Sequence, residues 1–120
     1  MSYLLLVIEK PEDRRDASAD EGRRRYDRMH QFAGNLQAQG VLMGAESLAL
    51  PTRGKRLMKR AGGTTLIDGP FAEAKEFVGG FFLLDCQTMD EAVAIADRCP
   101  AAEWSTVEVR QVASCFEDTE

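Results

Sequence analysis

The feature that most constrains the fold is a run of six apolar residues, Tyr-Leu-Leu-Leu-Val-Ile, at positions 3–8. Successive side chains of a β-strand point to opposite faces of the sheet, so a strand of this composition needs an apolar cover on both sides. Residues 81–86, Phe-Phe-Leu-Leu-Asp-Cys, begin with a similar apolar run. These two segments are therefore predicted to be the central strands of a sheet.

Two segments with helical spacing of apolar residues can cover one face of that sheet. Each begins with a capping box, in which a hydroxyl and a carboxylate three residues later satisfy the free amides at a helix start. The pairs are Ser18 with Glu21 and Thr88 with Glu91. They predict one helix from near residue 19 to Gly40 and a second helix over residues 89–98. Gly34 weakens the first helix, which predicts that it marks a close packing contact.

Further segments have the composition of strands, namely residues 42–50, 55–60, 64–67 and 105–112. The resulting element order is that of a ferredoxin-like α+β sandwich with an inserted β-hairpin, in which an antiparallel sheet carries two helices on one face. The charged strand at residues 55–60 is interpreted as an edge strand. The other face of the sheet stays apolar, and an exposed patch of that size predicts a second subunit and hence a homodimer. The length suits one domain, residues 1–120.

Composition argues against several classes of partner. Twenty acidic and fifteen basic residues give a net charge of −5, which opposes binding to nucleic acid or to an anionic membrane despite the basic run at residues 23–25. No apolar segment is long enough to direct the chain to a membrane. Cys86, Cys99 and Cys115 are odd in number and lack a CxxC pair, which predicts a cytoplasmic location, with Cys86 and Cys99 in the core. His30 is the sole histidine, so a dedicated metal site is not expected. No cofactor is expected either.

The most position-specific stretch is residues 68–85, DGPFAEAKEFVGGFFLLD, in which an Asp-Gly-Pro-Phe turn precedes a central strand. Glycine and proline at adjacent positions predict a rigid turn. Together with YLLLVIE at residues 3–9 and TVEVRQV at residues 106–112, this stretch resembles the DGPF branch of the YCII-related family along nearly the whole chain. The resemblance implies a dimeric α+β barrel, formed when the sheets of two chains face each other.

Asp68 is the first candidate for acid or base chemistry. The turn is expected to place its carboxylate at a strand end beside Phe71, where partial loss of water would suit it to proton transfer. The alternative is structural, because an Asp before Gly-Pro often binds the amides of its own turn. The charged residues that follow are interpreted as solvated, and they are Glu73, Lys75 and Glu76.

Glu108 and Arg110 are expected on the strand face away from Val107 and Val109. If the valines pack under the helices, the pair points into the dimer cavity, where Arg110 can hold a substrate carboxylate and Glu108 can orient it or act as a base. The alternative, given equal weight, is an ion pair across the subunit interface. The aromatic residues predicted to line the pocket are Phe71 and Phe81 or Phe82.

Some YCII-related proteins resemble enzymes because they carry a His and Asp pair, with the His in the first helix. When the helix is aligned through Gly40, that position falls on Met29, and His30 lies one residue away, a rotation of about 100°. This departure weakens the transfer of the pair. His30 is kept as a catalytic candidate beside Asp68, with a surface or partly packed histidine as the alternative.

Two functions of different classes follow. The first is an enzyme or a binder of a small organic acid in the barrel pocket, working by proton transfer without a cofactor, as in an isomerase, a lyase or lactone chemistry. The second is a non-catalytic regulatory module, because DGPF proteins resemble modules associated with extracytoplasmic-function sigma factors. An enclosed pocket that holds at least two of the candidate residues would favour the first.

Overall fold

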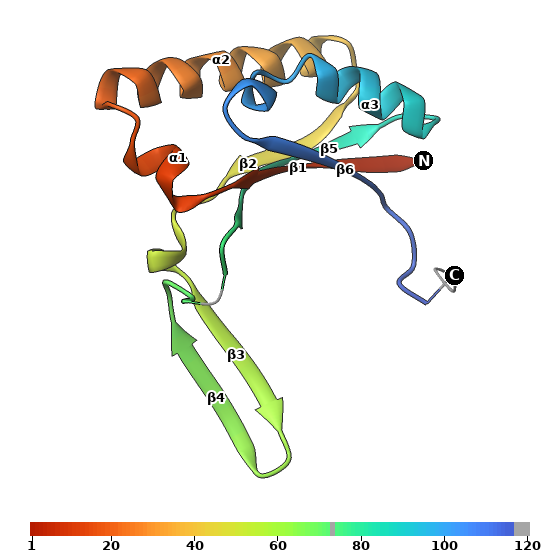
Figure 1. Ribbon diagram of the computed structural model, residues 1–120. Coiled ribbons are helices and arrows are strands. Elements are labelled where there is room, and N and C mark those ends of the chain that lie inside the picture. Colours follow the sequence, from red (N-terminus) through yellow and green to blue (C-terminus); the bar gives the residue numbers. More distant parts are fainter. Residues whose placement is uncertain (73, 117–120) are drawn as a thin grey trace.

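A four-stranded antiparallel sheet carries the helices on one face in the computed structural model, which describes residues 1–72 and 74–116 (Figure 1). The strands are β1 (Ser2–Glu9), β2 (Leu42–Ser47), β5 (Phe77–Asp85) and β6 (Thr106–Gln111), in the spatial order β2-β5-β1-β6. The helices are α1 (Pro11–Arg15), α2 (Ala19–Ala38) and α3 (Met89–Asp97), with 3₁₀ turns at Pro51–Arg53 and Pro100–Glu103. Two further strands, β3 (Lys55–Arg60) and β4 (Gly63–Asp68), form a separate hairpin. The predicted ferredoxin-like α+β sandwich with an inserted hairpin is confirmed.

The core lies between the sheet and the helices. Residues of β1 alternate between buried and half-buried, and Leu5 is fully buried in the core. Phe82 of β5 meets Phe32 of α2 edge to face, with ring centroids 5.2 Å apart, while the adjacent Phe81 points to the other side of the sheet. Because β1 and β5 occupy the two middle positions, the prediction of two central apolar strands is confirmed.

Both predicted helix starts are confirmed, but only the hydroxyl half of each capping box forms, because the Glu21 carboxylate pairs with Arg24 and Arg25 and the Glu91 carboxylate accepts from the Gln87 amide. The Ser18 hydroxyl accepts the Glu21 amide, and the Thr88 hydroxyl accepts the Glu91 amide. The prediction for Gly34 is wrong: this residue is exposed, and a Cβ built on it meets no atom within 4 Å.

Other local features differ from the sequence interpretation or refine it. Helix α1 was not predicted, and it begins where Pro11 follows Lys10, whose amide donates to the Asp13 carboxylate. Tyr26 of α2 does not join the core, because the residue is 59% exposed. Lys75 and Glu76 are exposed as predicted, and Glu73 lies outside the described residues.

Two of the cysteines are core residues, as predicted, because Cys86 and Cys99 are buried while Cys115 is exposed. Burial raises the pKa of both buried thiols. No helix within the described part of the chain is both long and apolar enough to cross a membrane.

The β3–β4 hairpin does not join the main sheet, so residues 55–60 are an edge strand, as predicted, but of a separate two-stranded sheet. We call residues 55–68 the arm. Every residue of the arm is exposed, and it projects on the side of the sheet opposite to the helices (Figure 1). The root of the arm is closed by the Gly69 amide, which donates to the Gly54 carbonyl at 2.9 Å.

A partly buried ion pair lies at the end of the sheet beside α1. Glu9 is 8% exposed, and its two carboxylate oxygens accept from Nε and Nη2 of Arg14, each at 2.9 Å. The same guanidinium donates to the Gly79 carbonyl at 3.3 Å. The register of β1 against β5 shifts between Val7 and Ile8, opposite Gly79, and a Cβ at Gly79 would overlap the Glu9 carboxylate. Glycine is therefore required here so that the ion pair can lie against the strand.

We expect Gly79→Ala to lower the free energy of unfolding by about 1–3 kcal/mol, because the added methyl group must displace a paired, buried carboxylate. Gly34→Ala is the matched control and should raise it by about 1 kcal/mol, since the new Cβ meets open space in a helix. Urea unfolding of both variants measures the difference. Equal stability of the two variants would contradict the role assigned to Gly79.

Candidate functional site

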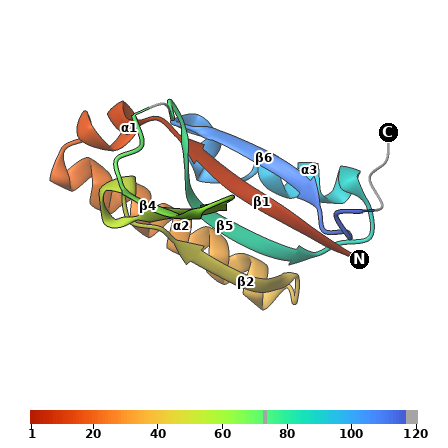
Figure 2. The ribbon, with the colours of Figure 1, turned by 90° about the horizontal axis from the view of Figure 1, so that it is seen from below.

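Figure 2 shows the face of the main sheet that the helices leave uncovered, here called the open face. Strand pairing brings three of the predicted site residues together on it, Phe81, Glu108 and Arg110. Cross-strand pairing aligns Glu46, Phe81, Leu6 and Glu108 in one row across the four strands. The next row contains Leu83, Leu4 and Arg110. The open face therefore has an apolar centre and charged side chains on its two edge strands.

Glu108 and Arg110 take the orientation that alternation predicts. Val107 and Val109 pack against the core, so the residues between and after them point to the open face. Arg110 Nε lies 3.8 Å from a carboxylate oxygen of Glu108, and both side chains are about half exposed or more, at 68% and 49%. A pair this exposed stabilises the fold little, which leaves both groups available to a ligand or a second subunit.

Glu46 is a polar group of the open face that the sequence interpretation missed. A register shift between Leu42 and Gly44 interrupts the alternation of side chains along β2. Counting residues along the strand therefore does not show on which face of the sheet Glu46 lies. Three strand spacings separate β2 from β6, so Glu46 and Glu108 stand about 14 Å apart across the apolar centre.

Asp68 and Phe71 lie apart from this face, at the root of the arm. The Asp68 carboxylate pairs with the Lys55 ammonium at 2.9 Å and is 77% exposed, so the desolvation expected for it is not found in the single chain. The Phe71 ring packs against the Arg56 guanidinium, 4.0 Å from the ring centroid. Gly69 is required between them because a Cβ there would overlap the Pro51 carbonyl. The Asp-Gly-Pro-Phe turn thus has a structural role in closing the arm.

His30 lies on the helix layer, on the other side of the sheet from Glu108 and Arg110. Its ring stacks on Tyr26, with centroids 6.1 Å apart, and the residue is exposed. Met29 instead packs against the core, where its sulfur lies 3.9 Å from the Cys99 thiol. Within one chain, His30 therefore does not meet Asp68, Glu108 or Arg110.

Two shallow depressions on the surface of the described residues are not formed by the predicted site residues. One of about 280 Å³ lies between the ends of β1 and β6, beside Asp13, Glu103 and Trp104. The other, of about 230 Å³, lies between α2 and the turn at Pro100. In the described residues, no three His, Cys, Asp or Glu side chains converge as a metal site would require.

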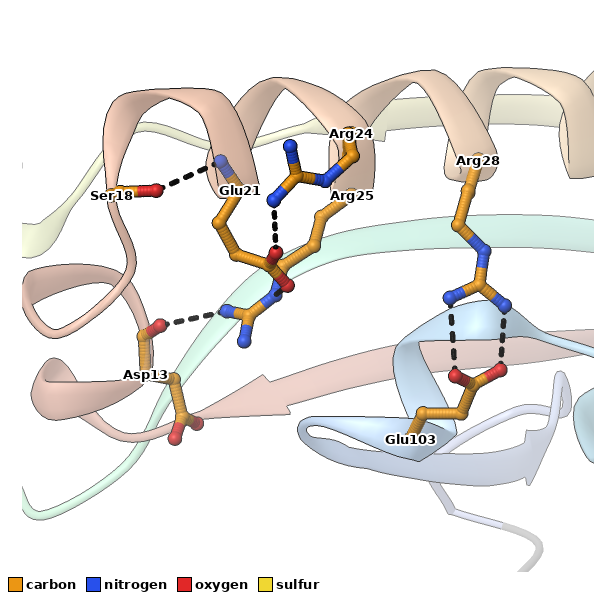
Figure 3. A network of polar contacts seen from close by, with 7 residues as sticks. All are labelled: Asp13, Ser18, Glu21, Arg24, Arg25, Arg28 and Glu103. Carbon is orange, nitrogen blue, oxygen red and sulfur yellow. Dashed lines mark hydrogen bonds and ion pairs between the residues drawn. The ribbon is translucent and has the colours of Figure 1, made fainter.

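Three arginines of α2, Arg24, Arg25 and Arg28, form ion pairs within the chain (Figure 3). Glu21 accepts from Arg24 at 2.8 Å and from Arg25 at 3.2 Å. Arg28 binds Glu103 through both nitrogens, at 3.1 and 2.6 Å, and holds the pKa of that carboxyl below its usual value. The guanidinium groups of Arg25 and Arg28 also lie over the Trp104 ring, at 5.0 and 5.5 Å from its centroid. These contacts tie α2 to the segment before β6 and give the basic cluster a structural role.

Comparison with known families matches residues 1–115 to the YCII-related domain. The chain belongs to the YCII-related family. An uncharacterized protein of Rhizobium meliloti (strain 1021) is 39% identical over 74 residues, which cover 59% of this chain and 60% of that protein. The match thus spans about 60% of the length of this relative.

A solved structure shows the same fold. It is the 5-chloro-2-hydroxyhydroquinone dehydrochlorinase TftG from Burkholderia phenoliruptrix AC1100, in complex with 2,5-dihydroxybenzoquinone. The two chains align with a TM-score of 0.54 at 12% sequence identity, over 99% of this chain and 100% of the other. At this identity the likeness establishes the architecture alone.

The Arg28–Glu103 pair predicts a pH-dependent effect on stability. Because the folded pKa of Glu103 lies below the ordinary value of 4.5, its stabilising effect is present above that value and is lost as pH falls through the folded pKa. We expect Glu103→Gln to lower the melting temperature at pH 7 and to lower it by less at pH 3, below the ordinary value of 4.5. Glu12→Gln, at an exposed position of α1, serves as the control. A Glu103→Gln penalty that is equal at both pH values would show that the charge is not involved.

Proposed function

We propose that two chains face each other through their open faces and enclose a cavity that binds a small, flat organic acid. The observation that carries this proposal is the row Glu46-Phe81-Leu6-Glu108, in which an apolar centre is flanked by charged groups within one sheet face. Pockets for small molecules have this composition, with mostly apolar walls and a few polar groups that fix orientation. A facing sheet is also the cover that the apolar residues of β1 and β5 require.

In this cavity Arg110 is proposed to bind the anionic group of the acid, since a guanidinium can donate two parallel hydrogen bonds to it. Glu108 on the same face is proposed as the base that removes a proton next to the carbonyl group, and Arg110 would stabilise the enolate that forms. The reaction is then a proton transfer without a cofactor, as in isomerisation or lactone chemistry. Glu108 replaces Asp68 and His30 as the first candidate for the base, because Asp68 is paired with Lys55 and His30 lies on the helix layer.

The similar fold of TftG supports a planar ligand by analogy, because that protein holds 2,5-dihydroxybenzoquinone. A hydroxyquinone is a conjugated acid whose flat ring matches an apolar floor made by Phe81 and Leu6, and its ionised oxygens match Arg110. The compound is therefore a suitable probe for this cavity, whatever the natural ligand is.

The dimer is tested by sedimentation. The wild-type chain of 13.3 kDa is expected to sediment as a dimer at micromolar concentration, and Leu6→Glu should sediment as a monomer, because it buries an unpaired charge at the centre of the interface. Val93→Glu is the control: Val93 is 48% exposed on α3, away from the open face. A wild-type chain that stays monomeric at these concentrations would refute the enclosed cavity.

Ligand binding is tested with 2,5-dihydroxybenzoquinone, which should raise the melting temperature of the wild-type chain. Arg110→Met should weaken its binding about 10- to 100-fold, corresponding to the loss of hydrogen bonds to a charged group. Arg23→Met, at an exposed position of α2, is the control. Glu108→Gln should retain binding but slow the exchange of the probe's ring hydrogens with deuterated water at least about tenfold, as measured by NMR. Equal exchange rates for wild type and Glu108→Gln would remove Glu108 from the mechanism.

A further inference from the structure

The arm exposes apolar side chains that nothing in its own chain covers within the described structure. Leu57 and Leu66 pair across its two strands and are 59% and 57% exposed. On its other face, Met58 and Ile67 are 37% and 40% exposed. An isolated two-stranded hairpin is marginally stable in water, because it lacks a third strand or a helix to pack against. The arm therefore has the properties of a segment that is stabilised by packing against another molecule.

The dimensions of the single chain also indicate a surface that a second molecule covers. Its radius of gyration is 16.3 Å, whereas a compact domain of this length has about 13.6 Å. Its accessible surface is 8616 Å², against about 6,450 Å² for a compact monomer of this mass. The excess, roughly 2,200 Å² per chain, is of the order that a permanent homodimer buries. Because every residue of the arm is exposed, the arm contributes to this excess.

Charge indicates which molecule the arm contacts. Residues 55–68 contain four basic residues and one acidic residue, whereas the rest of the chain contains eleven basic and nineteen acidic residues. A second copy of the chain thus presents to the arm a surface of opposite net charge. On the open face of that copy, the carboxylates of Glu46 and Glu108 stand on the two edge strands.

The length and direction of the arm allow it to reach a facing chain. Each of its strands has six residues, so it is about 20 Å long, and it projects on the same side as the open face (Figure 1). Two sheets that pack face to face lie only about 10 Å apart. In the proposed dimer, each arm must therefore extend past the facing sheet and run along the partner.

We infer that the arm of each chain packs against the second copy, with one of its apolar faces on the partner and its basic side chains beside the acidic edge of the partner's open face. The inference rests on the proposed dimer and deepens it, because the arm then contributes basic side chains to the rim of the partner's cavity. Each cavity is complete only when the arm of the other chain closes it.

The first test removes the arm. Since Gly69 donates to Gly54 at the root, residues 55–68 can be replaced by a Gly-Ser link without moving β2 or β5. Sedimentation should show a dimer dissociation constant raised at least tenfold, while circular dichroism shows a folded chain. Two double variants test the two faces of the intact arm. One is Leu57→Thr with Leu66→Thr, and the other is Met58→Thr with Ile67→Thr. One of these double variants should weaken the dimer. Val93→Thr on α3 is the matched control.

These measurements distinguish failure of the arm contact from failure of the sheet-to-sheet dimer. If the wild-type chain and the armless chain dimerise equally, and both threonine pairs do so as well, the inference is wrong while the sheet-to-sheet dimer stands. If the wild-type chain is a monomer, the arm contact and the sheet-to-sheet dimer are both wrong.

The second test locates the contact. A photo-cross-linking amino acid is placed at position 57, with position 93 as the control, in a mixture of ¹⁵N-labelled and unlabelled chains. Cross-links from position 57 should join labelled to unlabelled peptides, including those that contain Glu46 or Glu108, and position 93 should give none. Cross-links confined to one chain, joined only to co-purified nucleic acid or another protein, or absent altogether would each overturn the inference.

Discussion

The structure depends on one constraint, the apolar character of β1 and β5 on both of their faces. On one side this requirement is met within the chain, since Phe32 and Leu36 of α2 and the residues of α3 bury Leu5, Phe82 and Leu84. On the other side, Leu4, Leu6, Phe81 and Leu83 remain half-buried in the single chain. The hydrophobic effect that assembles the sandwich thus also leaves the chain with a surface that favours association.

Much of the fold could be predicted because it is encoded locally. Alternation along β6 predicted that Glu108 and Arg110 lie on the sheet face opposite to Val107 and Val109. Pairs of a hydroxyl and a carboxylate residue predicted where both longer helices begin. What failed depends on distant contacts. Strand composition cannot say which sheet β3 joins, and a register shift in β2 hid the orientation of Glu46. Asp68 and His30 could be named as candidates, but their position relative to Glu108 is set by tertiary structure. The link to a sigma factor stays a prediction.

The two sides of the molecule use charge differently. On the helix layer, Arg25 and Arg28 are held by carboxylates of the same chain and by the Trp104 ring, so their charge contributes to the packing of α2. At the end of the sheet, Glu9 and Arg14 are paired and largely buried against Gly79. On the open face, Glu108 and Arg110 are 3.8 Å apart and well exposed. A ligand or a second subunit that covers them would desolvate both, and this would strengthen their interaction with any bound charge.

The closed root of the arm also bears on how the chain folds. Strands β2 and β5 pair directly although residues 48–76 separate them, so their pairing must close a long loop. Once the arm has formed, its root bond between Gly54 and Gly69 shortens the effective loop to about half that length, and a twofold reduction lowers the closure cost by roughly 0.6 kcal/mol. Hairpins form in microseconds from local contacts alone. The segment that extends away from the domain in the folded state therefore also has a role during folding, because its early formation favours the pairing of β2 with β5.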